Sequence, residues 1–239
     1  MQLWFGFEVA QGYPMLPARV TDWARSPPES PAPGQIHIWR FPLAEKISDA
    51  TLLPQQERQR LQRITHAGRR QSWLNSRFVL RTLLGRYLGF APQTLEFAVT
   101  ARGKPCLPGD PLHFNLSHSG QWGLLAIAGS FPLGVDLERF RPVHDPLRIA
   151  ERMFPPEAQA MLASCQPGER EARFFEQWTL MEARQKLSGE GIFGSAFPPE
   201  QSHAYSFLPD EGYAAAVAWP GEAGPSIEPV FFQFVPGKR

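Results

Sequence analysis

The order of helix and strand patterns most constrains the fold of this chain of 239 residues. An apolar strand pattern at 36–41 is followed by helix patterns and then by short strands, and the same order begins again at residue 133. Strands and helices mixed in this way indicate an α+β protein. Because no sequence repeat recurs at a fixed period, the halves resemble each other only in the order of their elements. We expect a proline-rich N-terminal leader at 1–34, an N-terminal α+β half at 35–131 and a C-terminal α+β half at 132–239.

The predicted elements follow from apolar periodicity and from glycine and proline positions. Gly89 stops the long helix of the first half, and Gly189 and Gly191 stop that of the second. The leader is expected to be an irregular segment on the surface. The first half has predicted helices at 54–64 and 70–88 and strands at 36–41, 95–99, 113–116 and 122–128. The second has predicted helices at 146–153, 155–163 and 169–187 and strands at 133–138, 203–208, 213–219 and 229–235.

Composition narrows the class of protein. The chain is 43% hydrophobic and 20% charged, which is ordinary for a soluble globular protein, and its formal net charge of +1 argues against bulk nucleic-acid binding. Cys106 and Cys165 are far apart and belong to no CxxC pair, which fits a reducing compartment. The N-terminus has no signal-peptide pattern, and no apolar stretch reaches the ~20 residues of a membrane span. We expect a cytoplasmic protein that binds neither membranes nor nucleic acid.

Two acids lie in the apolar run that begins the second half. Asp136 and Glu138 are spaced i,i+2, so both carboxylates of a strand point to the same face. Burying unpaired carboxylates is costly, which favours a functional reason for their presence. The alternative is a strand whose acidic face meets solvent or nearby arginines such as Arg139 and Arg141.

A third acid follows on the last predicted long helix. Glu182 and Lys186 are spaced i,i+4 and share a helix face, and Glu182 continues the apolar stripe of Phe175 and Trp178. An acid in that place needs a cation or a metal as partner. The alternative is an exposed Glu–Lys pair worth ~0.3–0.5 kcal/mol. Three carboxylates and an ammonium brought together would hold a hard divalent cation next to a phosphate.

Basic residues gather upstream of these acids. Between Glu57 and Lys104 there are ten basic residues and only two acids, which suggests a polyanionic small ligand or an acidic protein partner. A solvated helix face is the alternative. The segment 114–120 is expected to be a strand end and turn that offers N–H groups, hydroxyls and an imidazole to a phosphate. The alternatives are an ordinary polar turn there and a plain surface loop at 102–105.

Four of these segments, taken in order, resemble a known family. Their motifs match those of the 4′-phosphopantetheinyl transferases of the surfactin-synthetase (Sfp) type, over roughly residues 36–219. Four motifs in order at matching intervals are specific, although each one alone is weak. The motifs are Gly103-Lys104-Pro105, Phe114-Asn115-Leu116-Ser117-His118-Ser119, Gly134-Val135-Asp136-Leu137-Glu138 and Trp178-Thr179-x-x-Glu182-Ala183-x-x-Lys186.

The resemblance implies a reaction. Such an enzyme moves the 4′-phosphopantetheine arm of coenzyme A onto a serine of an apo acyl or peptidyl carrier protein and releases adenosine 3′,5′-bisphosphate. Asp136, Glu138 and Glu182 would hold Mg²⁺, or Mn²⁺, against the pyrophosphate. Glu182 could take the proton of the carrier serine, Lys186 would stabilise the attacked phosphate, and Asp136 completes the expected catalytic set. The residues expected to bind coenzyme A are Arg69, Arg70, Arg102, Lys104, Ser117, His118, Asp136 and Lys186.

The resemblance also implies a fold and leaves alternatives. The two halves would be similar, related by a pseudo-twofold axis, with coenzyme A in the cleft between them, and one chain supplying both halves favours a monomer. One position departs from the family pattern, because Met181 stands where many members have a lysine. The alternatives are a non-catalytic module that binds a carrier protein or a nucleotide, and a metal-dependent phosphohydrolase.

Overall fold

The computed structural model describes residues 17–24, 30–46, 48–101, 103–189, 199–225 and 227–235. Arg102, Gly191 and most of the expected leader lie outside these residues. The α-helices of the described part are α1 (Gln55–Arg63), α2 (Ala67–Leu88), α3 (Pro146–Met153), α4 (Pro156–Ser164) and α5 (Pro167–Ser188). Short 3₁₀ helices span Ala50–Leu52, Pro92–Thr94, Pro199–Gln201 and Gly221–Ala223.

The strands form two main sheets and a small hairpin. The first sheet has the order β4-β5-β1-β9, the second β6-β8-β7, and β2 pairs with β3 alone. The strands of the first sheet are β1 (Gln35–Pro42), β4 (His113–Ser119), β5 (Trp122–Ala128) and β9 (Glu228–Gln233). Those of the second are β6 (Gly134–Arg139), β7 (Ser202–Phe207) and β8 (Tyr213–Pro220), and the hairpin is β2 (Ala98–Val99) with β3 (Pro105–Cys106).

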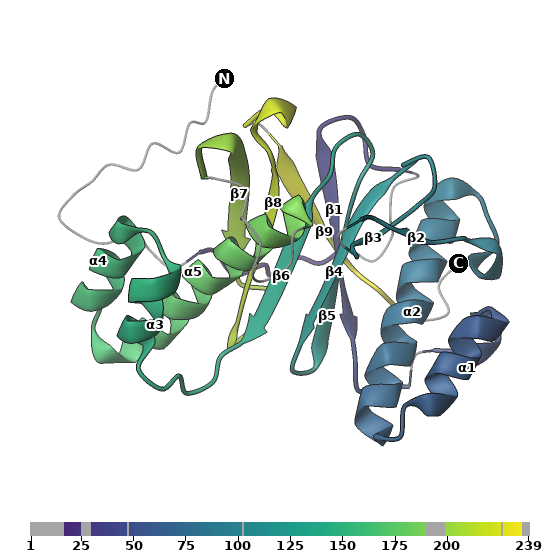
Figure 1. The fold of residues 1–239 in the computed structure, drawn as a ribbon, viewed down its shortest axis with the longest axis horizontal. Helices are drawn as coiled ribbons and strands as arrows, with labels where there is room; N and C mark the ends of the chain where they lie inside the picture. The colour runs from purple at the N-terminus through teal and green to yellow at the C-terminus, as the bar shows by residue number, and fades with distance from the viewer. Residues whose placement is uncertain are drawn as a thin grey trace.

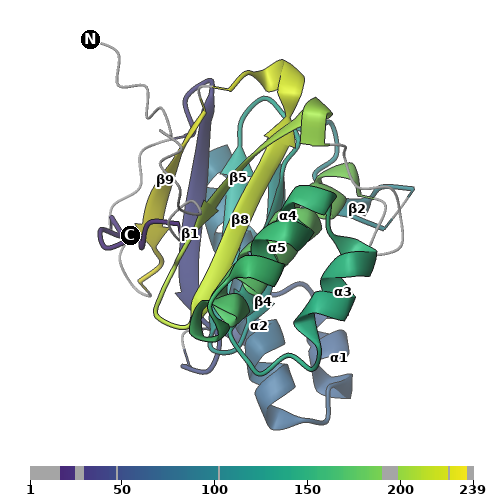
Figure 2. The same ribbon diagram turned by 90° about the vertical axis from the view of Figure 1, so that its left-hand side faces the viewer.

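The two sheets pack face to face, with α2 outside the first and α5 outside the second (Figures 1 and 2). The strand β1 shows why its sequence is almost continuously apolar. Trp39 and Phe41 pack in the cluster under α2, whereas Ile36 and Ile38 pack in the cluster shared by the two sheets. A strand covered on both faces needs apolar residues on both. The predicted α+β class is confirmed.

Most predicted elements are present, and two differ in extent. The strand expected at 95–99 is reduced to the two residues of β2. Arg81 of α2 donates hydrogen bonds to the carbonyls of Pro92 and Leu95 at 2.9 Å each. These carbonyls therefore bind a helix side chain instead of pairing with a neighbouring strand. The strand β4 runs on to Ser119, where the expectation placed a turn. The polar motif therefore lies in the strand itself, and the chain turns only at Gly120, which has a φ of 58°.

Two segments that are distant in sequence from their neighbours complete the sheets. The strand β9 pairs in parallel with β1, so it joins the sheet of the first half although it lies within the expected second half at 132–239. The segment 17–24 bridges both sheets, because Arg19 pairs with Leu208 beyond β7 and Ala24 pairs with Phe232 of β9.

Candidate functional site

The site begins with a close contact between β6 and α5. At Gly134 an added Cβ atom would lie 2.1 Å from the carbonyl oxygen of Ala183 and 2.4 Å from the amide nitrogen of Leu187. Only glycine therefore allows the strand to approach the helix so closely. This approach brings Asp136 of β6 within reach of Lys186 of α5.

Asp136 is the centre of a buried polar cluster. Its side chain is only 3% exposed, and its Oδ1 accepts hydrogen bonds from Ser117 Oγ at 2.9 Å and from Lys186 Nζ at 2.5 Å. Lys186 Nζ also donates to Ser117 Oγ at 2.9 Å. Three segments far apart in sequence thus meet at one carboxylate. The buried pairing offsets the cost of removing Asp136 from water.

Glu182 lies beside this cluster. Its Oε2 is 4.0 Å from Lys186 Nζ and its side chain is 13% exposed, so the alternative of an exposed pair is wrong. Burial, followed by the charge of Asp136, raises the pKa of Glu182 to about 7, against the lowering effect of Lys186. A carboxyl with that pKa can exchange a proton near neutral pH.

Glu138 lies farther along the same face of β6. Its Oε2 accepts hydrogen bonds from Ser119 Oγ at 3.0 Å and from Arg141 Nη1 at 2.7 Å. The expected alternative partner, a nearby arginine, is therefore present in Arg141. Arg141 is largely exposed, with 57% of its side chain accessible.

The carboxylates of Asp136, Glu138 and Glu182 are of the right chemical kind for a divalent cation. Their present spacing is too wide to hold one. Among the described residues, no group of three or more His, Cys, Asp or Glu side chains lies close enough to hold a metal ion as it stands. Lys186 is within ion-pair distance of both Asp136 and Glu182. However, Oδ2 of Asp136 is buried without a hydrogen-bond partner in the described part of the chain. A buried carboxylate oxygen with a free lone pair is a ligand that Mg²⁺ accepts.

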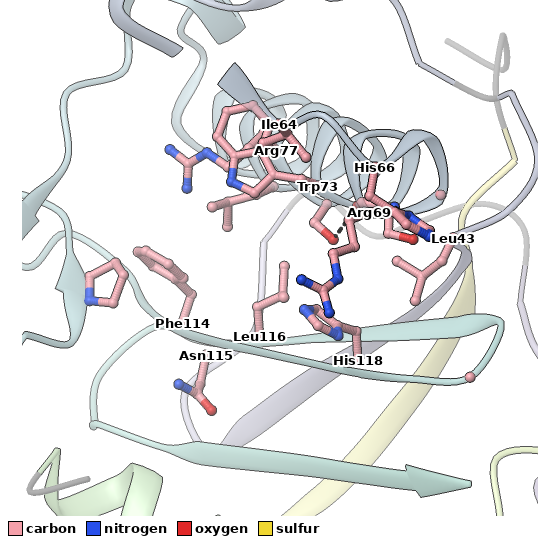
Figure 3. A pocket seen from close by; sticks show the side chains of 16 residues that line it. Leu43, Ile64, His66, Arg69, Trp73, Arg77, Phe114, Asn115, Leu116 and His118 are labelled. Atoms are coloured by element: carbon pink, nitrogen blue, oxygen red, sulfur yellow. Dashed lines mark hydrogen bonds between the residues drawn. The ribbon is translucent and has the colours of Figure 1, made fainter. Parts of the chain in front are cut away.

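A pocket of about 870 Å³ opens between the first turns of α2 and β4. Figure 3 shows Arg69 extending from α2 toward His118 of β4, while Asn115 points away to the opposite side of the strand. Trp73 and Leu116 form part of the apolar wall. This size and mixture of an apolar wall with a few polar groups suit a drug- or nucleotide-sized ligand.

The other expected coenzyme ligands lie elsewhere. Ser117 is buried at Asp136, and Arg70 is exposed and does not line the pocket. Lys104 Nζ donates to the Leu133 carbonyl oxygen at 2.8 Å and lines a neighbouring pocket of about 470 Å³. Burial lowers the pKa of Lys104 to about 8. The structure thus brings together Arg69 with His118, and Ser117 with Asp136 and Lys186.

Part of the basic stretch has a structural role. Arg77 and Arg81 of α2 both form ion pairs with Glu57 of α1. Their guanidinium groups also lie over the ring of Phe97, at 4.8 and 5.0 Å from its centroid. These arginines fasten α1 to α2, so the number of basic residues alone overstated the charge available to a ligand.

Sequence reasoning left Asn115 and Ser119 without roles. Asn115 Oδ1 accepts the Val135 N–H at 2.8 Å, and Ser119 contacts Glu138. The signal was the i,i+2 spacing of Asn115, Ser117 and Ser119, which places all three on one face of a strand. Assigning this segment to a turn concealed that spacing.

Comparison with known proteins matches both halves. The family model described as "4'-phosphopantetheinyl transferase, N-terminal" covers residues 38–130, and the "4'-phosphopantetheinyl transferase superfamily" model covers 132–219. The 4′-phosphopantetheinyl transferase HetI of Nostoc sp. is 34% identical over 236 residues, which span 89% of this chain and 98% of HetI. The chain belongs to the 4′-phosphopantetheinyl transferase superfamily.

Further relatives agree with this assignment. The transferase Sfp of Bacillus subtilis is 28% identical over 154 residues, covering 63% of this chain and 67% of Sfp. The transferase AcpT of Salmonella typhimurium is 35% identical over 122 residues, covering 51% of this chain and 60% of AcpT. The resemblance stated from the motifs is confirmed, and the protein is an enzyme of the transferase class. In the described part of this transferase, no helix is long and apolar enough to cross a bilayer.

Proposed function

We propose that this transferase moves the 4′-phosphopantetheine arm of coenzyme A to a serine of an apo acyl or peptidyl carrier protein, using Mg²⁺ or Mn²⁺ and releasing adenosine 3′,5′-bisphosphate. The observation that carries the proposal is the junction of β4, β6 and α5. There one lysine and three carboxylates gather within the matched family segments. The pocket that holds Arg69 and His118 opens on the opposite face of β4.

The pocket supports a place for the nucleotide end of coenzyme A. Arg69 and His118 supply a guanidinium and an imidazole that can pair with the 3′-phosphate. The side chains of Trp73 and Leu116 offer apolar surface to the adenine base. Arg70, Arg102 and Lys104 stay candidates for binding the same 3′-phosphate.

The transfer step needs a proton acceptor and a cation at the reacting phosphate. The carrier serine oxygen forms a bond to the phosphorus next to the pantetheine arm, and the bond from that phosphorus to the bridging pyrophosphate oxygen breaks. Glu182 would take the serine proton, and its pKa of about 7 supports that role. Lys186, released from Asp136, would stabilise charge on the phosphate under attack.

A divalent cation would be held by Asp136, Glu138 and Glu182 and would neutralise the pyrophosphate. The Oδ2 of Asp136, which has no hydrogen-bond partner among the described residues, supports this assignment. Ser117 then serves Asp136 rather than the coenzyme, because its hydroxyl is occupied by Asp136 and Lys186.

The test combines an apo carrier protein, coenzyme A and Mg²⁺, with the mass of the carrier as readout. We expect the carrier to gain one phosphopantetheine.

Asp136→Ala should abolish this gain while coenzyme A binding is partly retained. His118→Ala should raise the KM for coenzyme A, whereas Arg58→Ala on the exposed side of α1 should leave it unchanged.

Other outcomes would separate the alternatives. Release of adenosine bisphosphate without a carrier would indicate a phosphohydrolase. Coenzyme A binding without any mass gain on several carriers would indicate a non-catalytic module.

The proposal also covers the oligomeric state, the internal symmetry and the cellular location of the protein. We expect a cytoplasmic monomer whose halves are related by a pseudo-twofold axis. In support, both Cys106 and Cys165 are free thiols, and α2 and α5 each cover one sheet and each end at a left-handed glycine.

A further inference from the structure

The edges of β4 and β6 lie side by side but belong to different sheets. Side chains of β4 supply acceptors to main-chain donors of β6. Asn115 Oδ1 accepts the Val135 N–H at 2.8 Å, and Ser119 Oγ accepts the Arg139 N–H at 3.1 Å. These bonds hold the β6 backbone at a set distance from β4, and they satisfy N–H groups that an edge strand would otherwise leave unpaired.

The two serines between these strands share one arrangement. Each hydroxyl oxygen accepts from a nitrogen that can only donate: Lys186 Nζ for Ser117 at 2.9 Å, and the Arg139 N–H for Ser119 at 3.1 Å. The hydroxyl proton of each serine is therefore free to point at a carboxylate. Ser117 donates to Asp136 Oδ1 at 2.9 Å and Ser119 to Glu138 Oε2 at 3.0 Å.

Glu138 has a second donor, but of a different kind. Arg141 Nη1 lies 2.7 Å from the same Oε2, yet its side chain is 57% exposed and reaches back from the loop after β6. An exposed ion pair is weakened by solvent and salt. Ser119 is short, stands on a strand and is fixed by the Arg139 N–H, so it sets the direction of the Glu138 side chain more rigidly.

We propose that Ser119 is a positioning residue that orients Glu138 for a divalent cation. The hydroxyl holds Oε2 toward β4 through a charge-assisted hydrogen bond, so that Glu138 meets the cation in a preset direction. The inference rests on the proposed function, because it assumes that Glu138 is a cation ligand. Its effect is on the affinity for the cation, since Ser119 does not line the pocket assigned to coenzyme A.

The experiment is an isothermal calorimetric titration of Mn²⁺ into the 239-residue protein, without coenzyme A or carrier. Loss of a group that orients a metal ligand lowers affinity by roughly tenfold to a hundredfold. We expect that loss for Ser119→Ala and for Ser119→Cys, which keeps the size but is a weak donor. Ser119→Thr, which restores the hydroxyl, should bind within about threefold of the unmodified protein, a small change next to a tenfold loss.

Two controls test whether Ser119 affects cation binding through Glu138. Ser206→Ala removes a buried hydroxyl of β7 that has no hydrogen-bond partner in the described structure, and it should leave Mn²⁺ affinity unchanged. In a Glu138→Gln background, Ser119→Ala should cause no further loss, because the serine acts through that carboxylate. Near-ultraviolet circular dichroism checks that each variant is folded.

The outcomes separate two failures. If Glu138→Gln weakens Mn²⁺ binding but folded Ser119→Ala and Ser119→Cys do not, the positioning role is wrong and the metal proposal stands. If the unmodified protein binds no Mn²⁺, or Glu138→Gln binds it equally well, the metal role of Glu138 falls and the inference with it.

Discussion

His37 of β1 is fully buried against α2, where a buried hydrogen-bond network holds it. Trp39 donates its indole N–H to the Tyr87 hydroxyl oxygen at 2.9 Å, which leaves the Tyr87 O–H free to donate to His37 Nδ1 at 2.8 Å. The ring of Phe232 lies 4.9 Å away, between centroids. Nothing in this network favours a charged imidazole, and burial lowers the pKa of His37 to about 4.

The low pKa of His37 predicts a loss of stability in acid. In the unfolded chain the imidazole is protonated below its ordinary pKa of 6.5, whereas the folded chain keeps it neutral down to about 4. The unfolded state binds more protons in this window, so the free energy of unfolding falls as pH falls from 6.5 to 4, by up to ~3 kcal/mol. Urea unfolding at several pH values should show this fall, and His37→Gln should reduce it. Parallel pH profiles for the two proteins would contradict the role of His37.

The sequence predicted the neighbours of some site residues but not of others. Glu182 and Lys186 were predictable because a four-residue spacing on a helix fixes their neighbourhood. The meeting of Asp136 with Lys186 was expected from the family motifs but not from local spacing, because it depends on how closely β6 approaches α5. The assignment of Ser117 to Asp136 likewise depends on two strand edges that no local pattern brings together. The roles assigned to the site residues stay predictions.

At the scale of elements, Gly134 decides the spacing between the second sheet and the helix α5. The strand β6 and the helix α5 carry the acids and the lysine on facing surfaces. Periodicity was sufficient to predict both elements, since each buries a clear apolar pattern. It predicted a strand over 95–99 that shrinks to the two residues of β2, because Arg81 binds the Leu95 carbonyl that a longer strand would pair.

Gly134→Ala should separate these two elements. The new methyl group would overlap the backbone of α5, which cannot yield as a flexible side chain would, so we expect a loss of about 3 kcal/mol or more. Urea unfolding measures the loss, and transfer to the carrier should fall with it. Gly168→Ala in the first turn of the same helix has open space around it and is the matched control. That change should be neutral or slightly stabilising. Equal stability of the two variants would show that α5 can shift without cost.

At the scale of the whole molecule, Asp210 joins segments from both halves. It accepts the Trp122 indole N–H at 2.8 Å and a hydrogen bond from Arg19 at 3.2 Å, and it lies 3.8 Å from Arg40. The Arg40 guanidinium lies over the rings of Trp23 and Trp122, at 4.3 and 4.5 Å from their centroids. A charged and aromatic cluster thus closes the contact between the two sheets at this point.

Asp210→Ala should loosen that closure. Removing the carboxylate leaves the half-buried Arg40 without its counter-charge and the Trp122 N–H without its acceptor, at a cost of about 2 kcal/mol. The midpoint of urea unfolding, followed by tryptophan fluorescence, should fall accordingly. Glu211→Ala, at the exposed neighbouring residue, is the control and should match the unmodified protein. If the two variants unfold at the same midpoint, Asp210 contributes nothing beyond the surface.

The parallel pairing of β9 with β1 has a consequence for synthesis on the ribosome. In sheet order, β5 and β9 flank β1, and everything from β6 to β8 lies between them in the chain. The stretch from β6 to β8 is therefore, in topological terms, an insertion into the first sheet. The N-terminal half lacks an edge strand until residues near 228 have been made, so it cannot finish folding while the rest is still being translated. Late translation, rather than early collapse, then sets when the first sheet is complete.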